Sequence, residues 1–194
     1  MPENKKNKVE FGLRNVHYAI ANETSDGVIT LETPIPIPGS VTLTLDPSGD
    51  FVRFKADDVD YYTNDNNQGY EGALTVALVP ESFKTDVLGE IKTDDGVMLE
   101  SADAQTKRFA LLYEFQGDKK ATRHVSYYCS AKRPAIGSTT KDGGDPNTSE
   151  LSLISSPRPD NNLVKAKTTM EVNANAYNNW FKTVYEPPQE IETP

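Results

Sequence analysis

Residues 108–131 read RFALLYEFQGDKKATRHVSYYCSA, two alternating stretches separated by a Gly-Asp pair. In the first stretch, large apolar side chains recur at every second position, which is the period of a strand that buries one face. Each such side chain contributes about 1.5–3 kcal/mol when it is fully buried. The row consists of Phe109, Leu111, Tyr113 and Phe115. It predicts a strand in the hydrophobic core.

The second stretch predicts the partner of that strand. Gly117-Asp118 is typical of a tight hairpin turn, so we expect the chain to reverse there and return over 119–132. Alternation on the returning strand predicts one apolar side, made of Val125, Tyr127, Cys129 and Ala131. Cys129 is therefore expected to act as a small hydrophobic core residue.

The same period of two recurs along the chain. Val41, Leu43 and Leu45 alternate with polar residues, which predicts a half-buried strand. Around 73–79 both sets of alternating positions are apolar, which predicts a strand covered on both faces. Further strands are expected at 16–21, 27–32, 51–55, 59–63, 97–100, 150–155 and 163–172. Many short strands separated by turns predict a mainly β fold, a β-sandwich or a barrel-like sheet.

Two helices interrupt the strands. Pro80 suits a first helical position and Gly89 suits the residue after a helix, so a flanking helix is expected over 81–88. A short C-terminal helix is expected after Asn175, its predicted cap. Its apolar stripe comprises Tyr177, Trp180, Phe181 and Val184. Such a stripe must pack on the sheet or on a partner.

The whole chain, 1–194, is expected to form one domain, because it shows no interdomain linker and no internal repeat. Four polar segments are expected to lie outside the core. They are an N-terminal arm at 1–8, a long loop at 57–70, a loop at 134–149 and a C-terminal extension at 186–194.

Composition narrows the class of protein. The chain has 20 Lys and Arg against 29 Asp and Glu, a net charge of −9, which disfavours binding to nucleic acid or to an anionic membrane. Its longest apolar run is too short for a bilayer, so we expect no membrane association, and the first residues lack the apolar core of a secretory signal. Cys129 is the one cysteine, which excludes an internal disulfide and a cysteine zinc site and favours a reducing compartment.

No pattern of catalytic, cofactor-binding or metal-binding residues is present, so we expect no enzyme and no cofactor. His17 and His124 are interpreted as partly exposed strand histidines, because neither belongs to a nucleophile or metal motif. The acidic cluster at 57–60 lacks the spacing of a calcium loop, and DPSGD at 46–50 is interpreted as a turn between two strands. Neither a phosphate-binding glycine loop nor a carboxylate pair with diagnostic spacing stands out.

Three segments carry a family resemblance: EFGLRNVHYAI at 10–20, PIPIPGSVTLTLDPSGD at 34–50 and FKADDVDYYTNDNNQGYEGALTVALVPESFKTDVLGE at 54–90. In order and spacing they resemble the major tail proteins, which form the tail tube of long, non-contractile-tailed bacteriophages of Gram-positive bacteria. The resemblance is strong over 9–92 and looser beyond.

The resemblance implies a non-enzymatic virion protein, made in the cytoplasm of the host bacterium. Its copies would close into stacked homo-hexameric rings, and DNA would pass through the lumen without specific binding. It implies further contacts with tape measure, distal tail and tail terminator proteins, and an inter-ring role for 55–70. Some relatives carry an additional immunoglobulin-like domain at the C-terminal end, which we do not expect here because the sequence stops at Pro194. Acidity suits this role, because a lumen rich in Asp and Glu repels DNA; we expect acidic residues to outnumber basic ones there.

Two other functions fit the residues. A monomeric β-sandwich module that binds a receptor or a carbohydrate would use exposed aromatic rings, and Tyr61, Tyr62 and Tyr70 flank the expected long loop. A hydrolase would need two carboxylates that converge in a cleft.

Overall fold

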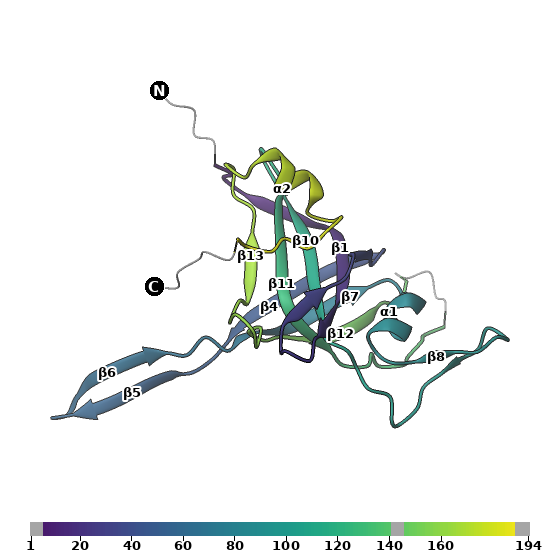
Figure 1. The fold of residues 1–194 in the computed structure, drawn as a ribbon, viewed down its shortest axis with the longest axis horizontal. Helices are drawn as coiled ribbons and strands as arrows, with labels where there is room; N and C mark the ends of the chain where they lie inside the picture. Colours follow the sequence, from purple (N-terminus) through teal and green to yellow (C-terminus); the bar gives the residue numbers. More distant parts are fainter. Residues whose placement is uncertain (1–5, 141–145, 189–194) are drawn as a thin grey trace.

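The computed structural model describes residues 6–140 and 146–188. Its large sheet is built from β1 (Glu10–Glu23), β2 (Ile29–Leu31), β3 (Ile35–Pro36), β4 (Ser40–Ser48), β7 (Gly69–Val76), β10 (Phe109–Gly117), β11 (Thr122–Ala131), β12 (Ser149–Ser155) and β13 (Lys165–Lys167). Two separate hairpins comprise β5 (Phe51–Ala56) with β6 (Val59–Asp65), and β8 (Ile91–Lys92) with β9 (Met98–Leu99). The helices are α1 (Glu81–Asp86) and α2 (Ala174–Asn179). The prediction of a mainly β fold with a flanking helix and a short C-terminal helix is confirmed (Figure 1).

The large sheet is antiparallel throughout. Its strand order is β2-β1-β10-β11-β12-β7-β4, with β3 added to β1 and β13 added to β11. The sheet curls so far that its distant strands β1 and β4 approach each other, although no ladder hydrogen bonds join them. The result is a barrel-like sheet that stays open.

β10 is buried on both faces and divides the core in two. Its residues Phe109, Leu111 and Tyr113 belong to the larger cluster, inside the curl, where Phe115 packs at the edge. Ala110 and Leu112 point the other way into a smaller cluster beneath α2. The predicted inward row is confirmed, and the opposite face of the same strand is buried as well.

α1 fills the inside of the curl with an aromatic ring. Phe83 is 1% exposed and meets Tyr18 and Phe109 edge to face, at ring-centroid distances of 5.1 and 5.4 Å. Such arrangements of aromatic rings are favourable beyond the area that they bury. Pro80 lies at the N-cap, one position before the expected one, and the helix ends at Asp86 rather than at 88.

α2 begins and ends earlier than expected, and the residues that follow it, Trp180, Phe181 and Val184, cover the outer cluster. Asn173, not Asn175, caps it, because the side-chain oxygen of Asn173 accepts a 2.8 Å hydrogen bond from the Ala176 amide. In the predicted stripe, Trp180 and Val184 are buried and the other two residues are half-buried. The stripe therefore packs on the sheet of its own chain.

The prediction that Val125, Tyr127, Cys129 and Ala131 share one face is wrong. The register between β10 and β11 shifts between the Phe109 and Leu111 pairs, which is a β-bulge. The bulge reverses the alternation, so Val125 and Tyr127 enter the outer cluster whereas Cys129 and Ala131 enter the inner one. β11 also begins at Thr122, after a four-residue connection.

Two strand predictions need correction in extent. β7 ends at Val76, so Leu78 is 73% exposed and the segment is not covered on both faces. Of the strand expected over 163–172, the segment Lys165–Lys167 alone pairs with β11. Beyond Lys167 the chain continues toward α2, so the alternating residues there do not pair with a neighbouring strand.

Two of the four polar segments have more structure than expected in their described residues. Asn7 binds the β10–β11 turn through its side chain, with Nδ2 donating to the Lys120 carbonyl at 2.7 Å. Within 57–70, residues Val59–Asp65 form β6, so the predicted long loop is mostly a strand, as the alternation at 59–63 indicated. Residues 134–140 and 146–148 are irregular, whereas Ser149 already belongs to β12; residues 1–5, 141–145 and 189–194 lie outside the described part.

A buried arginine anchors the start of the C-terminal extension. Arg158 is 3% exposed, and it forms ion pairs with Asp160 at 2.7 Å and with Glu186 at 2.8 Å. It also donates to the Ile29 carbonyl at 3.1 Å. Because a buried charge must be paired, these contacts hold residues 158–160 and 186 against the sheet. In the described part of the chain, neither helix has the length and apolar character to cross a membrane.

The close packing of β7 against β12 gives a test of this fold. Gly69 has φ +101°, and a Cβ there would lie 1.9 Å from the Ser155 carbonyl oxygen. We expect Gly69→Ala to lower the free energy of unfolding by about 3 kcal/mol, from strain and displaced backbone. Gly27→Ala is the matched control, because Gly27 also has positive φ but nothing within 4 Å; it should cost about 1 kcal/mol. Equal losses in urea unfolding would contradict the packing.

Candidate assembly surfaces

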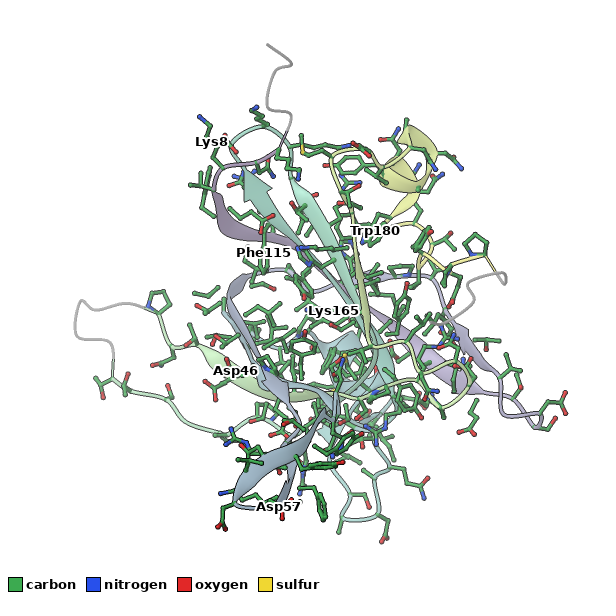
Figure 2. The ribbon with its side chains drawn as sticks, turned by 90° about the vertical axis from the view of Figure 1, so that its left-hand side faces the viewer. Lys8, Asp46, Asp57, Phe115, Lys165 and Trp180 are labelled. Atoms are coloured by element: carbon green, nitrogen blue, oxygen red, sulfur yellow. The ribbon has the colours of Figure 1, made fainter. Side chains whose placement is uncertain are left out.

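The first candidate surface is an arm that leaves the body of the molecule. β4 continues into β5, β6 returns into β7, and the β5–β6 hairpin extends away from the large sheet (Figure 1). Its turn, Asp57-Asp58, is made by two residues in the left-handed region, with φ of 53° and 61°. Aspartate tolerates this conformation better than most residues, so the tight turn suits the sequence. Figure 2 shows Asp57 at the end of the arm.

The arm bends at a defined joint. Gly49 and Asp50 are the residues that separate β4 from β5, so DPSGD at 46–50 does not reverse the chain as predicted. Gly49 has φ +136°, and a Cβ would lie 1.8 Å from the Asn66 carbonyl oxygen. The Gln68 amide donates to the Ser48 carbonyl at 3.0 Å across the joint. The two strands of the arm are therefore joined where they leave the large sheet.

The arm has one apolar face. Phe54 pairs with Tyr62, and Ala56 pairs with Val59, so these four side chains lie on the same face. Phe54, Val59 and Tyr62 are 59%, 60% and 55% exposed. The opposite face carries Arg53 and Thr63, which form the adjacent cross-strand pair. A two-stranded hairpin is marginally stable in water, so an uncovered apolar face of this size calls for a partner.

The second candidate surface is the edge of the large sheet at β4. One side of β4 pairs with β7 from Ser40 to Ser48, and its other side has no ladder partner within residues 6–140 and 146–188. Pro47 has no amide hydrogen, but the preceding residues keep free amides and carbonyls along this edge. Such an edge can accept a strand from another chain.

The third candidate surface is the uncovered face of β4, β7 and β12. One face of these strands buries Leu74, Val76, Leu151 and Leu153 in the inner cluster. The other face carries three cross-strand rows, in which all residues except Ala73 and Ile154 have a hydroxyl or a carboxylate. The rows are Thr42-Thr75-Glu150, Thr44-Ala73-Ser152 and Asp46-Glu71-Ile154. None of the three strands contains Lys or Arg, and the like charges of Asp46 and Glu71 lie directly opposite, a pairing that destabilises a sheet.

The predicted chemical residues do not converge on one site. Cys129 is buried in the inner cluster, where burial raises the pKa of its thiol to about 12, so it is a core residue as expected. His17 is half-buried and stacks on Phe181, at a ring-centroid distance of 4.9 Å. Asp57, Asp58 and Asp60 lie on the arm, and no cluster of three metal-ligating side chains occurs in the part of the chain that the structure describes.

His124 is half-buried, as the sequence indicated, and its ring packs between other aromatic rings. Its ring stacks on Tyr113 at 5.0 Å and also contacts Phe115, and its Nε2 atom is buried without a hydrogen-bond partner. Burial lowers the pKa of His124 to about 4; the Glu10 carboxylate has a smaller opposing effect, and the Lys167 and Lys165 ammonium groups lower the pKa further. His124 is therefore neutral at pH 7 and serves as a packing residue between aromatic rings.

Sequence reasoning missed the apolar face of the arm. The signal was present, because Phe54 and Ala56 alternate with charged residues, but composition led us to expect a polar loop over 57–70. The turn places Val59 and Tyr62 beside Ala56 and Phe54, and this pairing depends on the bulge at Tyr61, which no local pattern indicates.

An apolar arm, an open sheet edge and an uncovered acidic face are features of a structural protein that assembles through its strands. The sequence comparison agrees: a family model described as phage tail tube protein matches residues 1–129, from the N-terminus through most of β11. The chain belongs to this family, and the resemblance to major tail proteins is confirmed. No curated protein matches the chain. Membership identifies a structural protein of the bacteriophage tail that assembles with other tail proteins.

The lowered pKa of His124 can be tested through the pH dependence of stability. Because the folded-state pKa lies below the ordinary value of 6.5, the folded protein resists protonation of His124 more than the unfolded chain does. Stability should therefore fall as pH drops from 6.5 toward 4, with up to about 3 kcal/mol of the loss due to this residue. His124→Phe keeps the aromatic stack, so its unfolding free energy should lose correspondingly less over this range. Identical urea-unfolding pH profiles would contradict the assignment.

Proposed function

We propose that copies of this protein close into hexameric rings, and that the rings stack into the tube through which phage DNA leaves the capsid. Family membership supports a structural tail role, and the six-fold ring follows from the resemblance to major tail proteins. A heterologous contact, in which two different surfaces meet, is the kind that generates a ring when it closes. The protein then acts by geometry and not as an enzyme.

The observation that carries the proposal is the arm. The arm projects beyond its own sheet, and its apolar residues Phe54, Val59 and Tyr62 are more than half exposed because nothing in the described chain covers them. In the assembled tube, the arm lies on a neighbouring copy. Each subunit then makes two such contacts, one through its own arm and one with the arm of another copy, and both contribute to the buried area. Obligate interfaces bury on the order of 2,000 Å² or more. This role corresponds to the inter-ring function that the resemblance assigns to residues 55–70.

The face of β4, β7 and β12 is the proposed wall of the channel. Its charged side chains, Asp46, Glu71 and Glu150, are all acidic and exposed. DNA carries about one negative charge per 1.7 Å, so a wall without cations does not hold the phosphates. Screening limits this repulsion to about 8 Å at physiological salt, so it prevents adhesion without driving transport. The free edge of β4 lets the same wall continue into the next subunit.

The remaining partners follow from the position of a tube in a tail. One end of the tube would meet the distal tail and the other the terminator, and the lumen would hold the tape measure before DNA passes. We propose synthesis in the cytoplasm of the host bacterium, followed by incorporation into the virion tail. No membrane partner is needed for this sequence of events.

The experiment that tests the proposal removes the apolar face of the arm. Phe54→Ser with Tyr62→Ser should raise the protein concentration needed for rings or tubes at least tenfold, measured by sedimentation and negative-stain microscopy. The melting temperature of the subunit should not change, because these side chains are exposed. Arg53→Ser with Thr63→Ser is the matched control on the opposite face of the same ladder.

The outcome also separates the alternative function. Exposed Tyr61, at 74%, and Tyr62 are suited to stacking on a sugar ring, as in a monomeric module that binds a receptor or a carbohydrate. If the wild type remains monomeric at high concentration and binds a glycan through these rings, the tube proposal is wrong. If the serine variant assembles as well as its control, the arm does not carry assembly.

A further inference from the structure

A second hairpin, β8–β9, presents an apolar face that its own chain does not cover. Ile91 pairs with Leu99, and Val97 lies two residues before Leu99, so the three side chains share one face. Their exposures are 58%, 49% and 52%. On the opposite face, Lys92 forms an exposed 2.7 Å ion pair with Glu81 of α1. The apolar face therefore lies on the side of the hairpin that is turned away from α1.

The surroundings of this hairpin are acidic. Residues 81–104 carry seven Asp or Glu and two Lys. The exposed turn contains Asp94 and Asp95, and it is closed by the Gly96 amide donating to the Thr93 carbonyl at 2.9 Å. An apolar face beside a row of carboxylates fits a partner that is apolar and basic.

A surface of that kind lies at another end of the same chain. Val9 and Phe11 are 55% and 56% exposed at the beginning of β1. Over Glu10–Arg14, β1 pairs with β10 alone among the described residues, so the other edge of this segment is open. Lys6 and Lys8 are exposed beside it. Figure 2 shows Lys8 at the end of the molecule opposite to Asp57.

This end is basic in an acidic protein. Residues 6–14, 114–124 and 165–182 are brought together by β1, the β10–β11 turn, β13 and α2. They carry nine Lys or Arg and four Asp or Glu, although the whole chain has 20 basic and 29 acidic residues. In Figure 1 the first residues of β1 and the β8–β9 hairpin lie at different ends of the molecule, so the hairpin cannot cover Phe11 of its own chain.

We propose that the β8–β9 hairpin of one copy docks on the beginning of β1 in a neighbouring copy. Ile91 and Leu99 cover Phe11, and the Asp94-Asp95 turn faces Lys6 and Lys8. The contact joins two different surfaces and has a direction, so it can continue from copy to copy. It rests on the proposed self-assembly, and it is separate from the contact made by the β5–β6 arm.

Single-cysteine copies test the contact directly. Leu99→Cys and Phe11→Cys proteins are mixed at a concentration where the wild type assembles, and disulfide formation is then induced. We expect mixed dimers at least tenfold above the control mixture of Leu99→Cys with Val28→Cys, whose second position is exposed elsewhere. The native Cys129 is buried with a raised pKa, so it should not react.

Charge exchange supplies the second measurement. Asp94→Lys with Asp95→Lys should raise the concentration required for assembly at least tenfold, and Lys6→Asp with Lys8→Asp should do the same. Combining the four substitutions in one chain should restore most of the loss. Glu23→Lys with Asp26→Lys is the control, because it makes the same change of charge at the exposed β1–β2 turn.

The outcomes distinguish the two proposals. If the wild type forms tubes but no mixed dimers appear and the charge variants assemble normally, this contact is wrong and the tube proposal stands. If the wild type forms no assembly, both fail. If Lys6→Asp with Lys8→Asp abolishes binding of duplex DNA and leaves assembly unchanged, the basic end serves DNA and the docking proposal is overturned.

Discussion

A two-stranded hairpin is marginally stable in water by itself, and this constraint governs how the rest of the molecule is interpreted. The β5–β6 arm carries Phe54, Val59 and Tyr62 beyond the sheet that supports it. Burying one such side chain is worth about 1.5–3 kcal/mol, and no other segment of the described chain covers them. In the proposed tube, the free energy that stabilises the arm comes from a neighbouring copy, so the subunit would be complete only when it is assembled.

The body of the protein keeps this arm and the open edge in place without using them for its own stability. Phe83 of α1 fills the curl of the sheet, and Trp180 and Val184 cover the other side of β10. Arg158 forms ion pairs with Asp160 and Glu186, which hold the start of the C-terminal extension against the sheet. The two core clusters leave three features without a partner among the described residues: the arm, the free side of β4, and the face that bears Asp46, Glu71 and Glu150.

Local pattern predicted most of this fold, and it failed where the cause lies in tertiary contacts. Alternation located β10, β4 and both strands of the arm, and the apolar stripe located α2. The bulge in β11 was not predictable, because it responds to the register with β10 and not to its own sequence. Residues 57–70 were also expected as a long polar loop, since Asp and Asn dominate them, whereas the apolar face of the arm depends on a cross-strand pairing of Phe54 with Tyr62. The family resemblance at 9–92 identified the class of protein, but the residues of each surface required the structure.

Electron cryo-microscopy of the assembled protein is the most direct measurement of the central claim, that each copy completes the unfinished surfaces of the next. The account predicts a hollow tube of stacked six-membered rings in which the arm of every subunit is buried against a neighbour and Asp46, Glu71 and Glu150 face the channel. A reconstruction with the arms free in solvent, or with an inner wall made mainly of Lys and Arg, would contradict it.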